Sequence, residues 1–188
     1  MTLQEALSHI QQLFIRYGNE TYEEDCTQLQ HAQQSATLAL EWGLDEELAL
    51  AAFLHDIGHF LAQDSQLPDF DSYGYASHDE LGAAFLASCG FSARLCMLVA
   101  EHVNVKRYLA SVDPEYLANL SHASTMTLRQ QGGPMTPLEC EQYAKNNLLN
   151  DIVMLRKLDD SGKLPAMECP ALDEWMLRIE QHLTAQSQ

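Results

Sequence analysis

Residues 51–59 read Ala51-Ala52-Phe53-Leu54-His55-Asp56-Ile57-Gly58-His59, an apolar helical run that contains an adjacent histidine and aspartate. Burying an imidazole and a carboxylate in such a run costs free energy unless a charged partner meets them. Further histidines stand at His31, His78 and His102. A metal centre is the partner that these side chains suggest.

Composition limits the kinds of protein this can be. The 188 residues fit one domain, residues 1–188, with 46% hydrophobic residues to form its core. A net charge of −17 argues against nucleic acid and anionic membrane surfaces as partners. The five scattered cysteines contain no Cys-x-x-Cys pair, and we expect reduced thiols. With no leader-like or membrane-length segment, we expect a soluble cytoplasmic protein.

Helix signals recur along the chain and strand alternation is nearly absent, so we predict an all-α fold. Thr2 and Ser77, each three residues before a Glu, have the spacing of capping boxes, and Thr136 begins a further helix. Gly43 and Gly90 mark helix ends. The expected helices cover residues 3–17, 28–42, 46–62, 78–89, 93–109, 114–130, 137–146, 148–160 and 171–185. The last is amphipathic and could pack within the chain or against a partner, which leaves the oligomeric state open.

Six potential metal ligands are spread over these helices. A lone histidine on an apolar face is usually a hydrogen-bonded core residue, but six ligands at inward positions favour a metal site. The candidates are His31, His55, Asp56, His78, His102 and Asp159. They are too many for one tetrahedral zinc and suit two metals that share Asp56. The residues do not distinguish iron from manganese or zinc.

Two of the ten basic residues stand one helical turn from predicted ligands. Lys106 follows His102 by four residues, and Arg156 precedes Asp159 by three. Two cations beside the metals indicate an anionic substrate with a phosphoryl or phosphonyl group. The alternative is that they pair with carboxylates. His59 shares the face of His55, where it could donate to substrate or serve helix packing.

The pattern His31, His55-Asp56 and Asp159 resembles the HD-domain superfamily, whose members are mostly metal-dependent phosphohydrolases. With His78 and His102 added, the chain is similar to the dinuclear branch, which includes cyclic-dinucleotide phosphodiesterases and mixed-valent di-iron oxygenases. The similarity extends to the oxygenases that act on 2-amino-1-hydroxyethylphosphonate or its N-trimethylated form. It rests on residues 22–31, 51–59, 73–78, 102–108, 121–135 and 156–160, and the block Gln131-Gly132-Gly133-Pro134-Met135 is more specific than the His-Asp signature.

This resemblance implies an Fe(II)/Fe(III) enzyme that cleaves a carbon–phosphorus bond with O2, releasing phosphate and glycine or glycine betaine. One iron would be held by His31, His55, Asp56 and Asp159, and the second by Asp56, His78 and His102. The positions that match phosphonate-binding residues are Lys106, Ser124, Thr127 and Arg156, with His59 close to the substrate. Tyr22 matches a residue that can occupy the open position of the second iron and leave when substrate arrives.

The chain departs from the family pattern at Asp25, which stands near the position where the aminoethyl-specific relative has a glutamate. A carboxylate one methylene shorter leaves more room. The extra room would suit a methylated ammonium, which a neighbouring tyrosine could contact through a cation–π interaction. The amine substituent of the substrate therefore stays open.

Two other functions use the same residues. A phosphohydrolase would employ the same ligands and cations, with metal-bound hydroxide as the nucleophile. The absence of basic or aromatic features for a nucleotide, together with Tyr22 and the block at residues 131–135, favours the oxygenase. A catalytically inactive domain that binds a metal or a ligand gains little support, because none of the six ligands is missing.

The role of Tyr22 can be tested without substrate. Tyr22→Phe should increase substrate-independent oxidation of the iron pair, because water and dioxygen would reach the open position before substrate does. Electron paramagnetic resonance of the mixed-valent pair measures this lifetime. A lifetime equal to that of the wild type would contradict the gating role.

Overall fold

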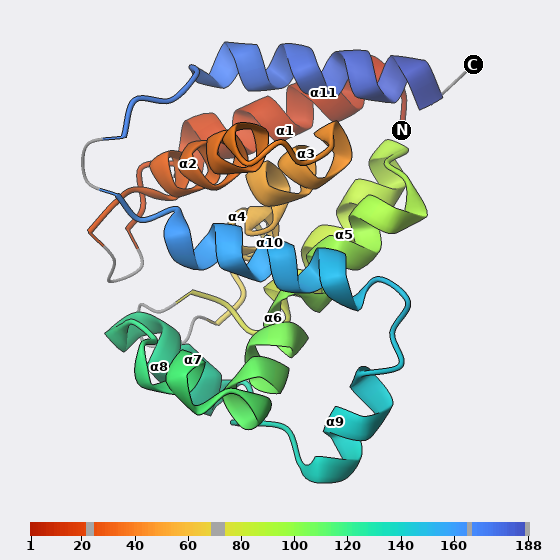
Figure 1. The fold of residues 1–188 in the computed structure, drawn as a ribbon. Coiled ribbons are helices and arrows are strands. Elements are labelled where there is room, and N and C mark those ends of the chain that lie inside the picture. Colours follow the sequence, from red (N-terminus) through yellow and green to blue (C-terminus); the bar gives the residue numbers. More distant parts are fainter. Residues whose placement is uncertain (22–24, 69–73, 165–166, 187–188) are drawn as a thin grey trace.

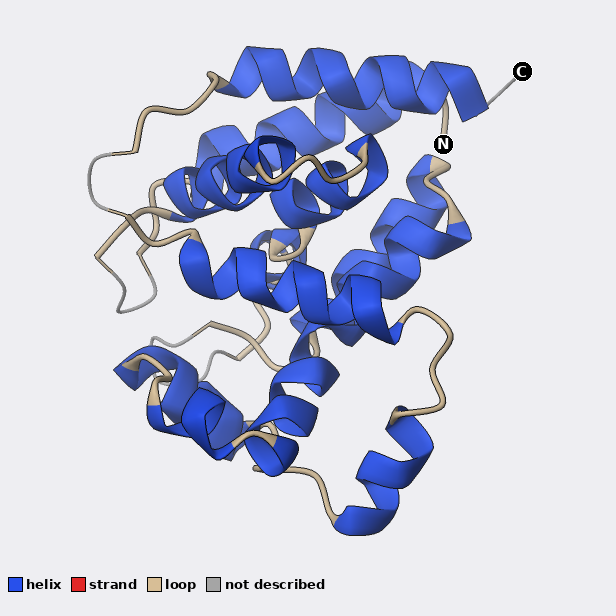
Figure 2. Ribbon diagram, in the orientation of Figure 1, coloured by secondary structure: helices blue, strands red, loops and turns tan. Residues whose placement is uncertain are grey.

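The computed structural model is a helical bundle that describes residues 1–21, 25–68, 74–164 and 167–186 (Figure 1). Within these residues the elements are helices and connecting loops, with no strand (Figure 2). The helices are α1 (Leu3–Tyr17), α2 (Gln28–Glu41), α3 (Glu46–Leu54), α4 (Ile57–Asp64), α5 (His78–Cys89), α6 (Ala93–Val112), α7 (Pro114–Ala118), α8 (His122–Gln130), α9 (Pro137–Tyr143), α10 (Leu149–Ser161) and α11 (Leu172–Gln186). The predicted all-α class is confirmed.

Two expected helices are each broken in two. The helix expected over residues 46–62 ends at Leu54 and begins again at Ile57, so His55 and Asp56 lie in the break between α3 and α4. The apolar sequence runs through this point without a proline, and its one glycine, Gly58, lies inside α4, so periodicity could not reveal the break. The helix expected over residues 114–130 is α7 and α8, because the Ser121 hydroxyl accepts from the backbone N–H of Ser124 (3.1 Å) and starts a new helix.

The predicted helix ends are mostly confirmed. Thr2 forms its capping box, Thr136 caps α9, and Gly43 and Gly90 take the left-handed conformation at φ 73° and 95°. The capping box expected at Ser77 is wrong. Ser77 is itself left-handed, with φ 53°, and its side chain makes no capping hydrogen bond.

The core joins the first helices to the last one. Phe53 of α3 stacks between Phe14 of α1 and Trp175 of α11, with ring centroids 4.6 and 5.2 Å apart. Trp175 and Ile179 are fully buried, and α11 lies across α1 in Figure 1. The apolar face of the last helix therefore packs within the chain.

The cysteines and the lengths of the helices can be compared with the expectations from composition. All five cysteines are free thiols, with Cys26 and Cys89 buried and the others partly buried. Among the described helices, none combines the length and apolar character needed to cross a bilayer.

Helices α4 and α5 cross at glycines. A Cβ atom on Gly58 would lie 1.7 Å from the carbonyl oxygen of His78 and 2.9 Å from the backbone nitrogen of Gly82. Only glycine allows the two backbones to approach so closely. This crossing brings the first residue of α5, His78, next to the break that holds Asp56.

Gly58→Ala should destabilise the protein by about 1–3 kcal/mol or more, because the new methyl group meets backbone that cannot rotate away. Gly43→Ala is the control: nothing lies within 4 Å of a Cβ there, so only the positive φ is penalised, at about 1 kcal/mol. Urea unfolding measures both. A Gly58→Ala cost no larger than that of Gly43→Ala would contradict the close-crossing explanation.

Candidate metal centre

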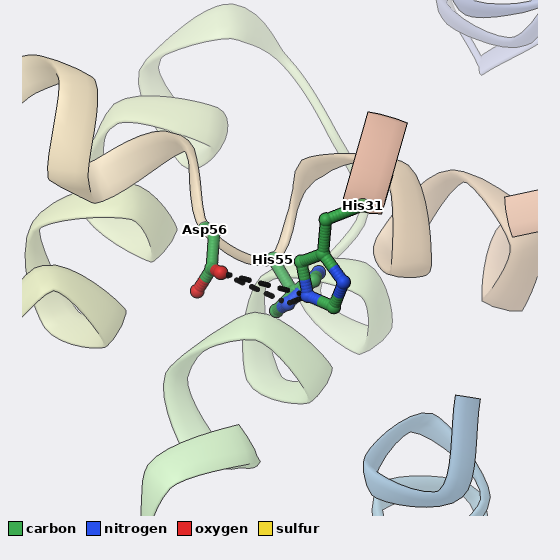
Figure 3. A group of neighbouring side chains, drawn as sticks. All are labelled: His31, His55 and Asp56. Atoms are coloured by element: carbon green, nitrogen blue, oxygen red, sulfur yellow. Dashed lines mark hydrogen bonds and ion pairs between the residues drawn. The ribbon is translucent and has the colours of Figure 1, made fainter. Parts of the chain in front are cut away.

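The six predicted ligands converge at the centre of the bundle. They come from α2 (His31), the α3–α4 break (His55 and Asp56), the start of α5 (His78), α6 (His102) and the end of α10 (Asp159). All but Asp56 are buried, and His55 is 0% exposed. Figure 3 shows His31, His55 and Asp56 pointing toward one another.

Backbone carbonyls orient all four histidines in the same way. Their Nδ1 atoms lie 2.6–2.8 Å from carbonyl oxygens of Gly162, Ala52, Tyr75 and Val99, for His31, His55, His78 and His102 respectively. A neutral imidazole that donates from Nδ1 keeps a lone pair on Nε2. Each histidine therefore turns a metal-ligating atom toward the centre, as ligating histidines normally do.

The two carboxylate oxygens of Asp56 face different histidine pairs. Its Oδ2 lies 3.3 Å from Nε2 of His55 and 3.8 Å from Nε2 of His31. Its Oδ1 lies 3.6 and 3.5 Å from Nε2 of His78 and His102. This division is the arrangement required of a carboxylate that bridges two cations.

Asp159 completes the first of the two groups. Its Oδ1 lies 3.2 Å from Nε2 of His31, and its Oδ2 lies 3.8 Å from Nε2 of His55. Two potential metal sites result. One has His31, His55, Asp56 and Asp159, and the other has Asp56, His78 and His102.

The electrostatics of the centre favour bound cations. The Nε2 atoms of His31 and His55 are 3.2 Å apart, and those of His78 and His102 are 2.9 Å apart. Two ring nitrogens at these distances share a positive charge, either a proton that one donates to the other or a metal ion that both bind. Burial alone would lower the pKa of His55, but Asp56 and Asp159 raise it to about 9. The donor set of imidazoles and carboxylates fits iron, manganese or zinc.

His59 is oriented differently from the four ligand candidates. The backbone N–H of Tyr75 donates to its Nδ1 (2.9 Å), so the ring proton of neutral His59 is on Nε2, 3.8 Å from Oδ1 of Asp56. Burial lowers the pKa of His59 to about 4, which keeps it neutral. His59 thus presents a hydrogen-bond donor to the site. Gly74 makes room for the ring, since a Cβ there would lie 2.4 Å from Cε1 of His59.

A cavity of about 80 Å³ adjoins the two groups, and one wall of it carries positive charge. Buried Lys106 donates from Nζ to Oγ1 of Thr127 (2.9 Å), and burial lowers the pKa of Lys106 to about 7. Ser124 and Arg156 also line this wall. Arg156 is paired with Asp159 (2.7 Å) and with Asp160. It therefore binds two carboxylates while it also lines the cavity. The wall formed by Lys106, Ser124, Thr127 and Arg156 is called the anion wall below.

Other predicted residues lie elsewhere. Asp25 is exposed and is not among the residues that line the cavity. Tyr22 lies outside the described residues. The cavity is also lined by Cys26, Gln28 and Lys163, which sequence reasoning did not assign to it. Gln28 could have been noticed, since it precedes His31 by three residues and shares its helix face.

Comparisons with known proteins identify the family. A sequence model of the HD domain matches residues 28–140. The chain belongs to the HD-domain family.

Individual relatives cover most of the chain. It is 40% identical over 164 residues to the 1-hydroxy-2-(trimethylamino)ethylphosphonate dioxygenase (glycine-betaine-forming) of Leisingera caerulea, covering 87% of this chain and 82% of the relative. It is 35% identical over 176 residues to the hydroxymethylphosphonate dioxygenase of Gimesia maris, covering 94% and 87%. An uncharacterised protein of Acanthamoeba polyphaga mimivirus is 34% identical over 173 residues, covering 92% and 79%.

The two groups predict the metal content of variants. After anaerobic reconstitution with ferrous iron, the wild type should hold about two metal ions per chain, and His102→Ala about one. Asp56→Ala should fall below one, because both groups lose a ligand. Elemental analysis by mass spectrometry measures the content, with His182→Ala, on α11, as control. Two ions retained in His102→Ala would contradict the division into two sites.

Proposed function

We propose that this protein is a mixed-valent di-iron oxygenase that cleaves the carbon–phosphorus bond of a 1-hydroxyphosphonate with O2. The products are phosphate and, from a 2-amino or 2-trimethylamino substrate, glycine or glycine betaine. The observation that carries the proposal is the placement of Asp56 between two histidine pairs beside a buried lysine. Two relatives with names that specify phosphonate dioxygenases support it.

In this proposal the two groups of ligands hold Fe(II) and Fe(III). His31, His55, Asp56 and Asp159 hold one ion, and Asp56, His78 and His102 hold the other. When bound, the iron pair supplies the one-electron chemistry that reduction of O2 requires. The protein supplies binding, orientation and a site screened from water.

The anion wall fixes the phosphonate. Lys106 uses one of its three donors on Thr127, which leaves two for phosphonate oxygens. Arg156, held rigidly by Asp159 and Asp160, adds positive charge, and Ser124 adds a hydroxyl. Fixing the anion places carbon 1 before O2 arrives, which lowers the entropic part of the barrier. His59 donates from Nε2 to a substrate oxygen nearby.

The far end of the substrate is less constrained. A cavity of about 80 Å³ suits a small phosphonate better than a nucleotide. Asp25, which we propose as the partner of an amine, is exposed in this structure. Asp25 would have to approach the cavity when substrate binds. In the same step Tyr22, as the resemblance implies, would leave the open position of the second iron.

Oxygen uptake separates the oxygenase from a hydrolase. Iron-reconstituted protein under limited O2 should release phosphate in step with oxygen consumption when given 1-hydroxy-2-aminoethylphosphonate, its trimethylated analogue or hydroxymethylphosphonate. Lys106→Met should raise KM by about 10- to 100-fold, the value of a charge-assisted contact.

The exposed Lys145, replaced by Met, is the matched control and should leave KM unchanged. Phosphate released without oxygen consumption would contradict the proposal and indicate a phosphohydrolase. Failure of all three phosphonates to react would contradict the assigned substrate class.

A further inference from the structure

A buried amide on the cavity lacks a partner for its oxygen. Gln28 is 6% exposed and lines the cavity. Its backbone N–H donates to the carbonyl of Glu20 (2.8 Å), but its Oε1 has no hydrogen-bond partner within the described residues. A buried acceptor in this condition costs folding free energy, and buried side chains of this kind are normally satisfied. A ligand in the cavity would satisfy it.

Gln28 and the anion wall line the same cavity from different helices. Gln28 is one helical turn before His31 on the same face of α2. Helices α2 and α8 lie on opposite sides of α10 in Figure 1, and the cavity is lined from both, by Gln28 on one and by Ser124 and Thr127 on the other. A phosphonate seated on the anion wall therefore lies in the same cavity as the unpaired oxygen of Gln28.

We propose that Gln28 determines specificity by accepting a hydrogen bond from the 1-hydroxyl group of the substrate. This inference rests on the proposed function. A phosphonate dianion offers only acceptors, so it is not the partner of Oε1. A trimethylammonium group has no N–H. The hydroxyl is the one donor shared by the two phosphonates that the relatives' names specify.

A second amide, Gln131, could compete for this role. Its Oε1 also lacks a hydrogen-bond partner within the described residues, and it lines the cavity. It follows Thr127 by four residues at the end of α8, however, so it belongs to the side that receives the phosphonate. It is also only partly buried.

The test compares two ligands that differ only in the hydroxyl. Iron-loaded protein is titrated without O2 by calorimetry with hydroxymethylphosphonate and with methylphosphonate, so that binding is measured and no turnover occurs. In Gln28→Met, which keeps the side-chain length without the acceptor, the preference for the hydroxylated ligand should fall about 10-fold. The Kd for methylphosphonate should stay within about 2-fold, because that ligand never uses the contact.

Stability provides a second readout. Gln28→Met and Gln28→Leu should keep or raise the melting temperature of the metal-free protein, because each removes an unpaired buried acceptor. A residue with a purely structural role would lower it. Gln130→Leu is the matched control, since its Oε1 is also buried without a partner in the described residues, but Gln130 does not line the cavity. It should leave the ligand preference unchanged.

Three results would overturn the proposal. The preference could be the same in both Gln28 variants as in the wild type, it could fall in Gln131→Leu instead, or wild type could bind neither ligand. The proposed function fails separately, if wild type binds hydroxymethylphosphonate with the expected dependence on Gln28 but consumes no O2.

Discussion

The site depends on one carboxylate that two groups of ligands share. Asp56 lies in the break between α3 and α4, 3.3 Å from His55 on one oxygen and 3.5 Å from His102 on the other. The histidines it faces come from helices separated by long stretches of chain, so the bundle must bring four helices to one point. Burying so many polar groups costs free energy unless cations compensate. Buried Lys106 and Arg156 supply part of that charge, and the proposed metal ions supply the rest.

Backbone atoms, more than side chains, hold the ligands in place. Each of the four histidines donates from Nδ1 to a carbonyl oxygen, and one of these carbonyls belongs to a glycine that has no room for a side chain, Gly162. A Cβ on Gly162 would lie 2.2 Å from Oγ of Ser35. The close crossing at Gly58 places the backbone of His78 itself, since a Cβ there would lie 1.7 Å from the His78 carbonyl oxygen. Carbonyls fixed by helix packing cannot swing as side chains do. The ring orientations are therefore set before a metal or a substrate binds.

Much of the architecture was predictable from local signals. Capping residues and glycines gave most helix ends, because they act within a few residues. The break at His55-Asp56 was not predictable, since the apolar run continues through it. The alternative prediction for Arg156, that it pairs with carboxylates, is also confirmed. Asp159 and Asp160 lie on the same face of α10 and both bind its guanidinium group.

The helical class, the residue types that can hold metal and the cations one turn away from two of them could all be read from the order of the residues. These features follow from composition and helical spacing. Three further features emerge from the folded chain alone. The oxygens of Asp56 divide between two histidine pairs, His59 offers a proton where its neighbours offer lone pairs, and Gln28 is buried on the cavity. Each depends on atoms that meet through space from distant parts of the chain, which no spacing along one helix encodes.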